Sequence, residues 1–343
     1  MFDEINVLWW WKIGTWFVVN AAKQNPDTTF NLITRNKSKF IDNELFYIKN
    51  IKVYDYTDDV NKNLPCFYCV SVNEQKVIEE EWSRNKNINR VLILKHNLKI
   101  AYEMLDYIEK IKPKFLFVVT NPVEVVSTFL HTKLQNTQVF WLWLELDSKR
   151  IKDLLSLFFN LNIDRDLFVL WNHSLFPIPL LSNTLIYDKL KNMTISDILL
   201  NLKDKKNYNY CNTEIDYYEE FYNYINLECL DIWLNDLIPI EKVYEIISYF
   251  TWLLVKSEFS NNKPPVKNPV DSLVLTASKL LDFKENIINV SYFSNTWVYT
   301  WWLLKINWKW EFNSIDIKIS DYEKDMIYKW DLKMCVSFID VLI

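Results

Sequence analysis

The first 140 residues alternate between short apolar runs and longer segments in which apolar residues recur every three or four positions. The short runs are typical of buried strands, and the longer segments have the period of an amphipathic helix. Strands and helices should therefore alternate along this part of the chain. We expect strands at INVLW, TFNLIT, FYCVSV, FLFVVTNP and TQVFWL, and helices at Lys12–Gln24, Arg90–Lys112 and VEVVSTFLHTKLQ.

This alternation predicts the topology of the sheet. Strands joined by helices are usually parallel, and strands that are apolar throughout are covered on both faces. We therefore expect an α/β domain with a doubly wound parallel sheet over residues 1–140. In such sheets the ligand binds beside the carboxyl ends of the strands.

The remainder of the chain, residues 141–343, has a different pattern. Helix and strand signals no longer alternate regularly, and a polar stretch rich in Lys, Asn and Tyr spans about residues 184–230. We expect a second domain of the α+β class here. Its predicted elements are helices at Ser148–Phe159, from Ile240 and at Pro269–Leu281, a strand at DLFVLW, and a β-rich end over 287–319 before a closing helix.

Charge and hydropathy narrow the classes of partner. The formal net charge is -5 with 24% charged residues, which leaves no basic surface for nucleic acid. No apolar run approaches the roughly 20 residues of a membrane span, and the start, MFDEINV, is unlike a signal peptide. We expect a cytoplasmic protein that binds a small molecule, with no nucleic-acid or membrane partner.

The five cysteines are an odd number scattered over a long chain, which favours reduced thiols over a disulfide framework. Cys66 and Cys69, in the run CFYC, have the spacing of half a metal site. The run has the pattern of a buried strand, however, where residues three apart point to opposite faces, and no second cysteine pair follows. We expect two core cysteines and no metal.

Glycine and tryptophan occur in unusual numbers, with 1 Gly against 16 Trp. Average usage predicts roughly 24 glycines in a chain of this length. Tight turns need positive φ angles, which glycine adopts readily and asparagine only in part. Several tryptophans stand in predicted turns or at strand ends, as in NTW, INWKW and WLW, where glycine has a use and an indole has none.

One hypothesis explains both numbers. The tryptophans stand for glycines if UGA codons that the source organism reads as Gly were translated as Trp, and the abundance of Asn, Lys and Ile fits an AT-rich genome. The alternatives are an interfacial aromatic belt or a base-stacking surface, which gather aromatic residues on one face. The tryptophans are instead dispersed from Trp9 to Trp330. UGG codons at these positions would exclude the hypothesis.

The opening stretch VLWWWKIGTW changes most under this interpretation. With Gly for Trp it becomes VLGGGKIGTG, and positions 9, 11 and 14 form G-x-G-x-x-G between a strand and a helix. The first glycine makes the tight turn, the second lets a pyrophosphate approach the backbone, and the third allows close helix packing. Trp9, Trp11 and Gly14 are thus candidate residues of a dinucleotide site, and the indoles as written would obstruct it.

Further motifs follow in order, namely RNKNINRVLILKHN, VVTNPVEVV, VFWLWLELDSKR, VLWNHSLFPIPLL and LLKINWKWEFNSIDIKISDYEKDMI. With glycine for tryptophan, the chain resembles the NAD-dependent lactate and malate dehydrogenases nearly from end to end. The motifs look like the family's substrate loop, its T-N-P-V-[DE] signature, its I-G-x-G-x-x-L-D-x-x-R and G-x-H-G-D-x-x-V-P-L segments, and its closing hairpin and helix. The resemblance implies a Rossmann domain over 1–140, a catalytic domain over 141–343, and a homodimer or homotetramer.

The resemblance also implies catalytic residues. Oxidation of a 2-hydroxy acid needs a base for the hydroxyl proton, and a histidine with an ordinary pKa suits both directions. His173 matches the family's histidine. Asp147 would pair with His173 and stabilise its protonated form, although it also stands where a helix N-cap is expected. Arg150 would hold the substrate carboxylate through a bidentate fork.

Other residues match the family's substrate and cofactor contacts. Arg90 would polarise the substrate carbonyl when the loop closes and excludes water. Asn121 would hydrogen-bond both substrate and nicotinamide, and Asn97 would contact the cofactor. Each of these residues also has an ordinary interpretation as a solvated charge or a turn or helix-face amide. The expected cofactor-binding residues are Trp9, Trp11, Gly14, Thr34, Asn97, Val119 and Asn121.

Arg84 bears on the choice of substrate. The family has Gln at this loop position for a methyl-bearing substrate and Arg for one with a second carboxylate, because Arg pairs with that carboxylate. Arg84 therefore implies malate and oxaloacetate over lactate and pyruvate. Two alternatives stay open, lactate or another 2-hydroxy acid, and a nucleotide-binding relative without catalysis. The latter is suggested by Ser174, Leu175 and Phe176, where the family has Gly-Asp-[Ser/Thr].

The choice of cofactor is also open. About 20 residues after Gly14, where an acid usually binds the ribose 2'-hydroxyl, the chain has Thr34 followed by Arg35. The loss of the acid beside an arginine admits the 2'-phosphate of NADP. We therefore expect NAD, with NADP as the alternative.

Overall fold

The structure is a computed structural model of the chain. It forms two compact units, residues 1–145 with 266–315, and residues 146–265 with 316–343. The structure describes residues 3–9, 12–40, 47–72, 90–161, 167, 169–170, 178–184, 186–203, 208–210, 213–228, 232–258, 267–282, 286–293, 299–306, 311–314 and 319–326.

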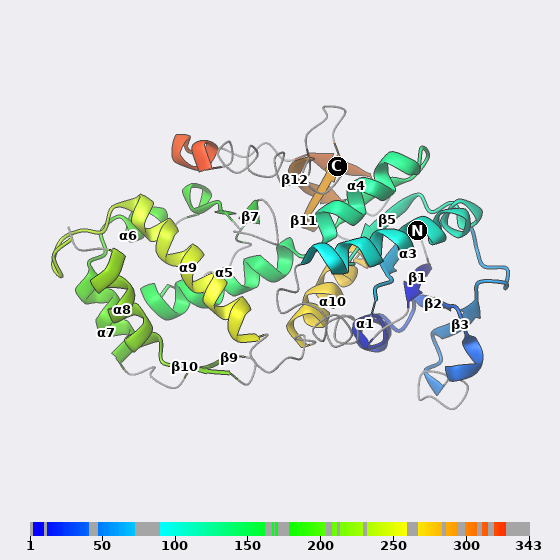
Figure 1. Ribbon diagram of the computed structural model, residues 1–343, viewed down its shortest axis with the longest axis horizontal. Coiled ribbons are helices and arrows are strands. Elements are labelled where there is room, and N and C mark those ends of the chain that lie inside the picture. Colours follow the sequence, from blue (N-terminus) through cyan, green and yellow to red (C-terminus); the bar gives the residue numbers. More distant parts are fainter. Residues whose placement is uncertain are drawn as a thin grey trace. The chain divides into compact units, whose positions relative to one another are not determined.

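The first unit is built on a sheet whose parallel part has the strand order β3-β2-β1-β4-β5-β6 (Figure 1). The strand order reverses beside β1, which lies between β2 and β4, so the sheet is doubly wound as predicted. β3, a half-buried edge strand, is not among the strands indicated by the sequence. The strands are β1 Glu4–Trp9, β2 Thr29–Thr34, β3 Ile51–Asp55, β4 Cys66–Cys69, β5 Phe115–Val118 and β6 Gln138–Trp141.

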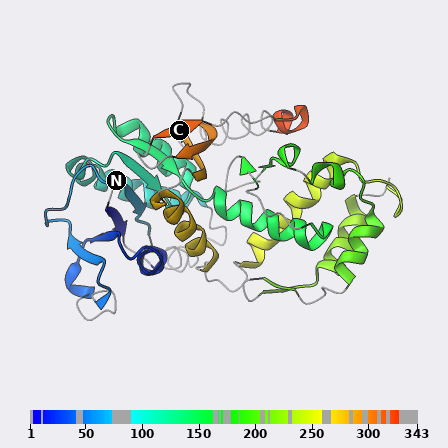
Figure 2. The ribbon, with the colours of Figure 1, turned by 180° about the vertical axis from the view of Figure 1, so that it is seen from behind.

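Helices cover both faces of this sheet. From β1 the chain crosses to β2 in one direction along the sheet, and from β4 through β5 to β6 it crosses in the other direction. Because strand-helix-strand crossovers are right-handed, the helices of these two sets of crossovers lie on opposite faces. Figures 1 and 2 show α3 and α4 on one side and α1 and α10 on the other. The 3-10 helix η1 is Lys37–Phe40, and the α-helices are α1 Lys12–Gln24, α3 Arg90–Ile111, α4 Val123–Lys133 and α10 Lys267–Leu281.

A row of phenylalanines forms the core on the α1 side. Phe67, Phe117 and Phe140 face each other across β4, β5 and β6, with ring centroids 5.1 Å and 5.3 Å apart. Phe17 from α1 adds to the row at 4.9 Å from Phe67. All four rings are fully buried, so this row fixes the register of the strands and the position of α1.

Three antiparallel strands extend the same sheet beyond β6. β11 pairs with β6, with Ser291 opposite Trp141, and β12 and β13 follow in order. We expected a boundary near residue 140 with everything after it in one domain, whereas residues 266–315 belong to the first compact unit. The physical reason is the open edge of β6, which β11 covers with a long-range pairing. The strands are β11 Asn286–Phe293, β12 Tyr299–Ile306 and β13 Phe312–Ser314.

The second unit is mainly helical. The stretch 184–230, which looked merely polar in the sequence, contains two amphipathic helices, α7 and α8, that contribute Ile198 and Phe221 to the core. Phe158 lies among these helices, 4.5 Å from Phe250 and 5.5 Å from Phe221. The elements are α5 Leu144–Phe159, β7 Val169–Leu170, β8 Ile178–Pro179, η3 Leu181–Asn183, α6 Tyr187–Leu190, α7 Ile195–Lys203, β9 Tyr208–Tyr210, β10 Thr213–Ile215, α8 Tyr217–Glu228 and α9 Ile240–Glu258.

Cys66 and Cys69 are free thiols inside β4, as expected for core cysteines. Both are buried, and burial raises the pKa of each thiol far above its ordinary value, so neither is a thiolate at neutral pH. Among the described residues there is no group of three potential metal ligands. Within the same residues, no helix combines the length and the apolar character needed to cross a membrane.

Candidate active site

The carboxyl ends of β1, β4 and β5 meet where the strand order reverses. In open α/β sheets this reversal creates a crevice beside the strand ends, and ligands bind there. The side chains that follow these three strands in the chain are therefore the first candidates for a site. Trp9 ends β1, and Val119, Thr120 and Asn121 follow β5.

Asn97 connects two of these strand ends. Its side chain is fully buried on α3. The backbone N–H of Val72, which follows β4, donates to Asn97 Oδ1 at 2.9 Å, and Asn97 Nδ2 donates to the carbonyl of Asn121 at 2.5 Å. One amide thus satisfies a backbone donor after β4 and a backbone acceptor after β5, which sets the spacing between the two strand ends.

Backbone contacts hold the segment after β5 against β4. The N–H of Val119 donates to the carbonyl of Tyr68 at 3.0 Å, and Thr120 Oγ1 donates to the carbonyl of Val70 at 2.7 Å. The side-chain oxygen of Asn121, Oδ1, is buried and has no hydrogen-bond partner among the described residues. A buried acceptor without a partner costs about 1–3 kcal/mol, so this atom suits a donor supplied by a ligand.

Two tryptophans lie at the same strand ends. Trp9 is 3% exposed and contacts Gly14 of α1, with its Cγ and Nε1 each 3.1 Å from where a Cβ of residue 14 would be. Trp143, also 3% exposed, donates from Nε1 to the carbonyl of Val119 at 2.8 Å. Asn121 therefore fits a bound dinucleotide, whereas these two indoles do not, because they lie where its pyrophosphate and nicotinamide would approach the strand ends.

Thr34 and Arg35 stand at the end of β2. Thr34 is buried, and the guanidinium of Arg35 lies in solvent, where its Nη2 is 2.9 Å from Glu103 Oε2. Both side chains of this ion pair are about half exposed, so water screens the attraction between them. No acidic side chain occupies the position of Thr34, as already apparent in the sequence.

In the second unit, α5 places an acid and a base one helical turn apart. Arg150 Nη1 donates to Asp147 Oδ1 at 3.0 Å, and both side chains are at most 3% exposed. Charges buried this deeply are costly unless they are paired. Asp147 lies inside α5, which begins at Leu144, and not at the N-cap position considered from the sequence.

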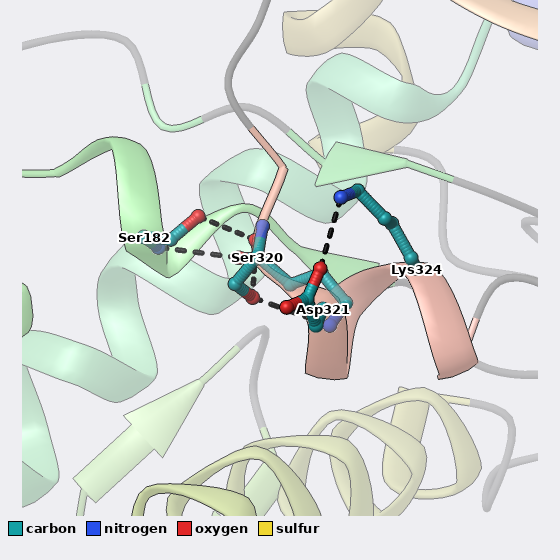
Figure 3. A network of polar contacts seen from close by, with 5 residues as sticks. Ser182, Ser320, Asp321 and Lys324 are labelled. Atoms are coloured by element: carbon teal, nitrogen blue, oxygen red, sulfur yellow. Dashed lines mark hydrogen bonds and ion pairs between the residues drawn. The ribbon is translucent and has the colours of Figure 1, made fainter.

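A buried carboxylate that the sequence analysis did not single out is Glu323, on the short helix over residues 321–326. Its oxygens accept hydrogen bonds from Ser182 N at 3.1 Å and Ser320 N at 2.7 Å, and from the hydroxyl groups of both serines (Figure 3). Tyr244 Oη donates a further hydrogen bond to Glu323 at 2.6 Å. Glu323 N in turn donates to Ser320 Oγ at 3.2 Å. This is a capping box, and the S-x-x-E pattern at Ser320–Glu323 could have revealed it.

No protein-family model matches the chain. Among curated proteins, an L-2-hydroxycarboxylate dehydrogenase (NAD(P)(+)) of Methanocaldococcus jannaschii is 31% identical over 132 residues, which are 36% of this chain and 42% of that protein. A malate dehydrogenase of Methanococcus maripaludis is 25% identical over 162 residues, 45% of this chain and 50% of that protein. The matches thus span about half the length of these relatives.

Solved structures match over nearly the whole chain. A Cryptosporidium parvum lactate dehydrogenase, solved with lactic acid and nicotinamide adenine dinucleotide, has a TM-score of 0.67 at 16% identity, over 99% of this chain and 97% of that one. This chain has the fold of the lactate and malate dehydrogenases. A lactate dehydrogenase from a Medee basin deep-sea metagenome library has a TM-score of 0.66 at 14% identity, covering 99% of both chains. Malate dehydrogenase of Archaeoglobus fulgidus, solved with NADH, has a TM-score of 0.61 at 13% identity, over 96% of this chain and 99% of that one.

The expected cofactor residues that the structure describes all belong to the first unit, and two pairs of them are in contact. Asn97 contacts Asn121, Val119 contacts Trp143, and Trp9 contacts Gly14. Asp147 and Arg150 are paired in the second unit. Trp11, Arg84 and His173 lie outside the described residues, and of Arg90 only the backbone is described, as the first residue of α3.

Proposed function

We propose that the chain is an oxidoreductase that interconverts a 2-hydroxy acid and its 2-oxo acid with NAD or NADP as the electron carrier. The observation that carries the proposal is the 31% identity to a protein named L-2-hydroxycarboxylate dehydrogenase (NAD(P)(+)), together with the lactate and malate dehydrogenase fold. The buried Asn121 Oδ1 at the carboxyl end of β5 supports it, because this end of the sheet is where such a reaction needs a hydrogen-bonding group.

The proposed roles of the chain's own residues follow from their chemistry. His173 accepts the proton of the substrate hydroxyl and returns it in the reverse reaction, since an imidazole is both an effective base and an effective acid near neutral pH. Asp147 orients His173 and stabilises its protonated form. Arg150 binds the substrate carboxylate, and its 3.0 Å bond to Asp147 keeps the guanidinium paired while no substrate is bound.

We further propose malate and oxaloacetate as the substrate pair. Arg84 supports this choice, because a guanidinium pairs with the second carboxylate of a dicarboxylic acid and has no partner on the methyl group of pyruvate. Arg90 is proposed to polarise the substrate carbonyl from the same loop. The protein is proposed to be cytoplasmic and to act as a homodimer or homotetramer, as expected from the sequence.

The test is steady-state oxidation of NADH and NADPH with oxaloacetate and with pyruvate, using the chain with glycine at its tryptophan positions. A kcat/KM for oxaloacetate at least about 10-fold above that for pyruvate is expected, the ratio that about 1.4 kcal/mol of differential binding produces. Arg84→Gln should reduce or reverse this preference. Turnover of pyruvate but not oxaloacetate would contradict the malate assignment, and dinucleotide binding without turnover of either acid would favour the non-catalytic relative.

A further inference from the structure

The backbone of Trp143 has a conformation that belongs to glycine. Its φ angle is 109°, in the turn between the end of β6 and the start of α5. The other described non-glycine residues with positive φ have values of 47° to 63°, within the left-handed region that side chains tolerate. At 109° a Cβ atom clashes with the residue's own backbone, so the fold here calls for a residue without one.

The indole of Trp143 also fills space beside the strand ends. Its side chain leaves the β6–α5 turn and reaches the carbonyl of Val119, just after the end of β5, through a 2.8 Å hydrogen bond. With 3% of its surface exposed, the ring is enclosed at this end of the sheet. A glycine at position 143 would both remove the strain in the backbone and leave this space empty.

A second buried indole, that of Trp9, fills space at the end of β1, which β4 separates from β5 in the sheet. A Cβ atom on Gly14 would overlap Cδ1 of Trp9, so the indole occupies the space directly against the only glycine in the chain. The turn from β1 into α1 is the place where a phosphate approaches the backbone N–H groups of a helix N-terminus. Trp9 is the last residue of β1, directly before this turn, and its indole lies against Gly14 at the start of α1. A glycine at position 9 would leave this space open.

From these two sites we infer that positions 9 and 143 are glycine in the form of the chain that binds a dinucleotide, and that the tryptophans as written close the crevice between β1 and β5. The inference deepens the proposed function, since it concerns the same crevice. The inference also agrees with the composition of 1 Gly and 16 Trp. Translation of UGA codons as Trp would account for the tryptophan at both positions and for this composition.

The test compares dinucleotide binding by the chain as written and by a variant carrying Trp9→Gly, Trp11→Gly and Trp143→Gly, with NADH and NADPH titrated in a calorimeter. The glycine variant is expected to bind at least one of them at least 10-fold more tightly. Trp143→Ala in the same background, which removes the indole but keeps a Cβ at this φ, should bind less tightly than glycine. Trp252→Gly, which alters an exposed indole inside α9, is the control. It should leave dinucleotide affinity unchanged, even though a glycine inside a helix lowers stability.

Equal binding by both chains, or absence of binding by a cooperatively folded glycine variant, would overturn the inference. Binding without turnover of any 2-hydroxy acid would leave the inference intact and remove the proposed function. If the glycine variant does not fold, peptide mass spectrometry of the protein purified from its natural source gives the answer. The tryptic peptide Leu134–Lys149 is expected to contain glycine at positions 141 and 143, and tryptophan at 143 would refute the inference.

Discussion

Asn97 Nδ2 lies 2.5 Å from the backbone carbonyl of Asn121. Because Asn97 Oδ1 also accepts from the N–H of Val72, this one side chain joins the segments that follow β4 and β5. The sequence predicted a direct contact between Asn97 and the cofactor. The internal hydrogen bonds give Asn97 a positioning role toward Asn121 in addition.

Asn97→Ala should therefore lower the free energy of unfolding by about 1–3 kcal/mol, since the part-buried N–H of Val72 and carbonyl of Asn121 each lose their partner. Urea unfolding measures the change. The matched control is Asn20→Ala, which removes an amide bonded to its own helix at an exposed position and should cost less than about 1 kcal/mol. A similar loss in both variants would argue against a special role for Asn97.

Glu323 should be sensitive to a change that keeps its shape. Glu323→Gln replaces an acceptor oxygen by an NH2 group, which then faces donors from Ser182, Ser320 or Tyr244. We expect the second unit to lose about 2–3 kcal/mol of stability, measured by urea unfolding. Glu245→Gln, in an exposed pair with Lys242, serves as the control and should change stability by less than about 0.5 kcal/mol. A tolerated Glu323→Gln would mean that this network is not needed.

Glu4 should contribute a stability term that depends on pH. Partial burial raises the pKa of this carboxyl, but hydrogen bonds from Asn31 and Asn61 and the charge of Lys52 outweigh it, so the pKa lies below its ordinary value of 4.5. A lowered folded-state pKa means that the contribution is fully present above 4.5 and is lost as the pH falls through the folded-state value.

The variant Glu4→Gln tests this sign. It should be less stable than the parent chain at neutral pH, and the difference should shrink as the pH falls from about 6 to about 3. Thermal unfolding midpoints across this range measure it. A difference that stays constant or grows toward low pH would contradict the expected direction.

His173→Asn should lower kcat by about 10²–10⁴-fold in the glycine-containing chain, because the substrate hydroxyl loses its proton acceptor. Dinucleotide affinity should not change, since the imidazole is proposed to act on the other substrate. His131→Asn, which alters a partly buried histidine in the last turn of α4, is the matched control and should leave kcat unchanged. Unchanged turnover in His173→Asn would remove this residue from the mechanism.

Arg35 should decide part of the choice between NADH and NADPH. Its guanidinium forms a half-exposed pair with Glu103. Arg35 also directly follows Thr34, a position where an acid would repel a 2'-phosphate. Arg35→Ala should weaken NADPH binding about 10-fold and NADH binding much less, because a charge-assisted bond to phosphate is lost. Lys110→Ala removes another surface charge as a control. Equal weakening of NADPH and NADH binding would show that Arg35 does not recognise the 2'-phosphate.

Several elements were predictable because their signals are local. β2 and α1 begin and end where the apolar pattern predicts, at Thr29–Thr34 and Lys12–Gln24, and α3 ends at Ile111, one residue before the expected end. β3 was not apparent because its burial is confined to a few positions at the edge of the sheet. α7 and α8 were concealed by the surrounding Asn, Lys and Tyr, since their few apolar residues are buried only by packing against each other.

Some of the site residues could likewise be predicted from the sequence, and others could not. The resemblance of the sequence motifs to the dehydrogenases pointed to Asn97, Asn121, Asp147 and Arg150. The hydrogen bond between Asn97 and Asn121 joins groups 24 residues apart and could not be predicted from the sequence. Glu323 escaped notice because a buried acid looks like any other charge on a short helix until Ser182 and Tyr244 are brought to it.

The sequence by itself determined the alternation of strands and helices, the parallel sheet, and the shortage of glycine, because these depend on residue type and on spacing along the chain. Only the tertiary structure decided that β11 joins the edge of β6, which amides and carboxylates satisfy each other, and that position 143 has a φ of 109°. Those features arise from contacts between distant segments and from the path of the backbone between them, which no local pattern of residues specifies.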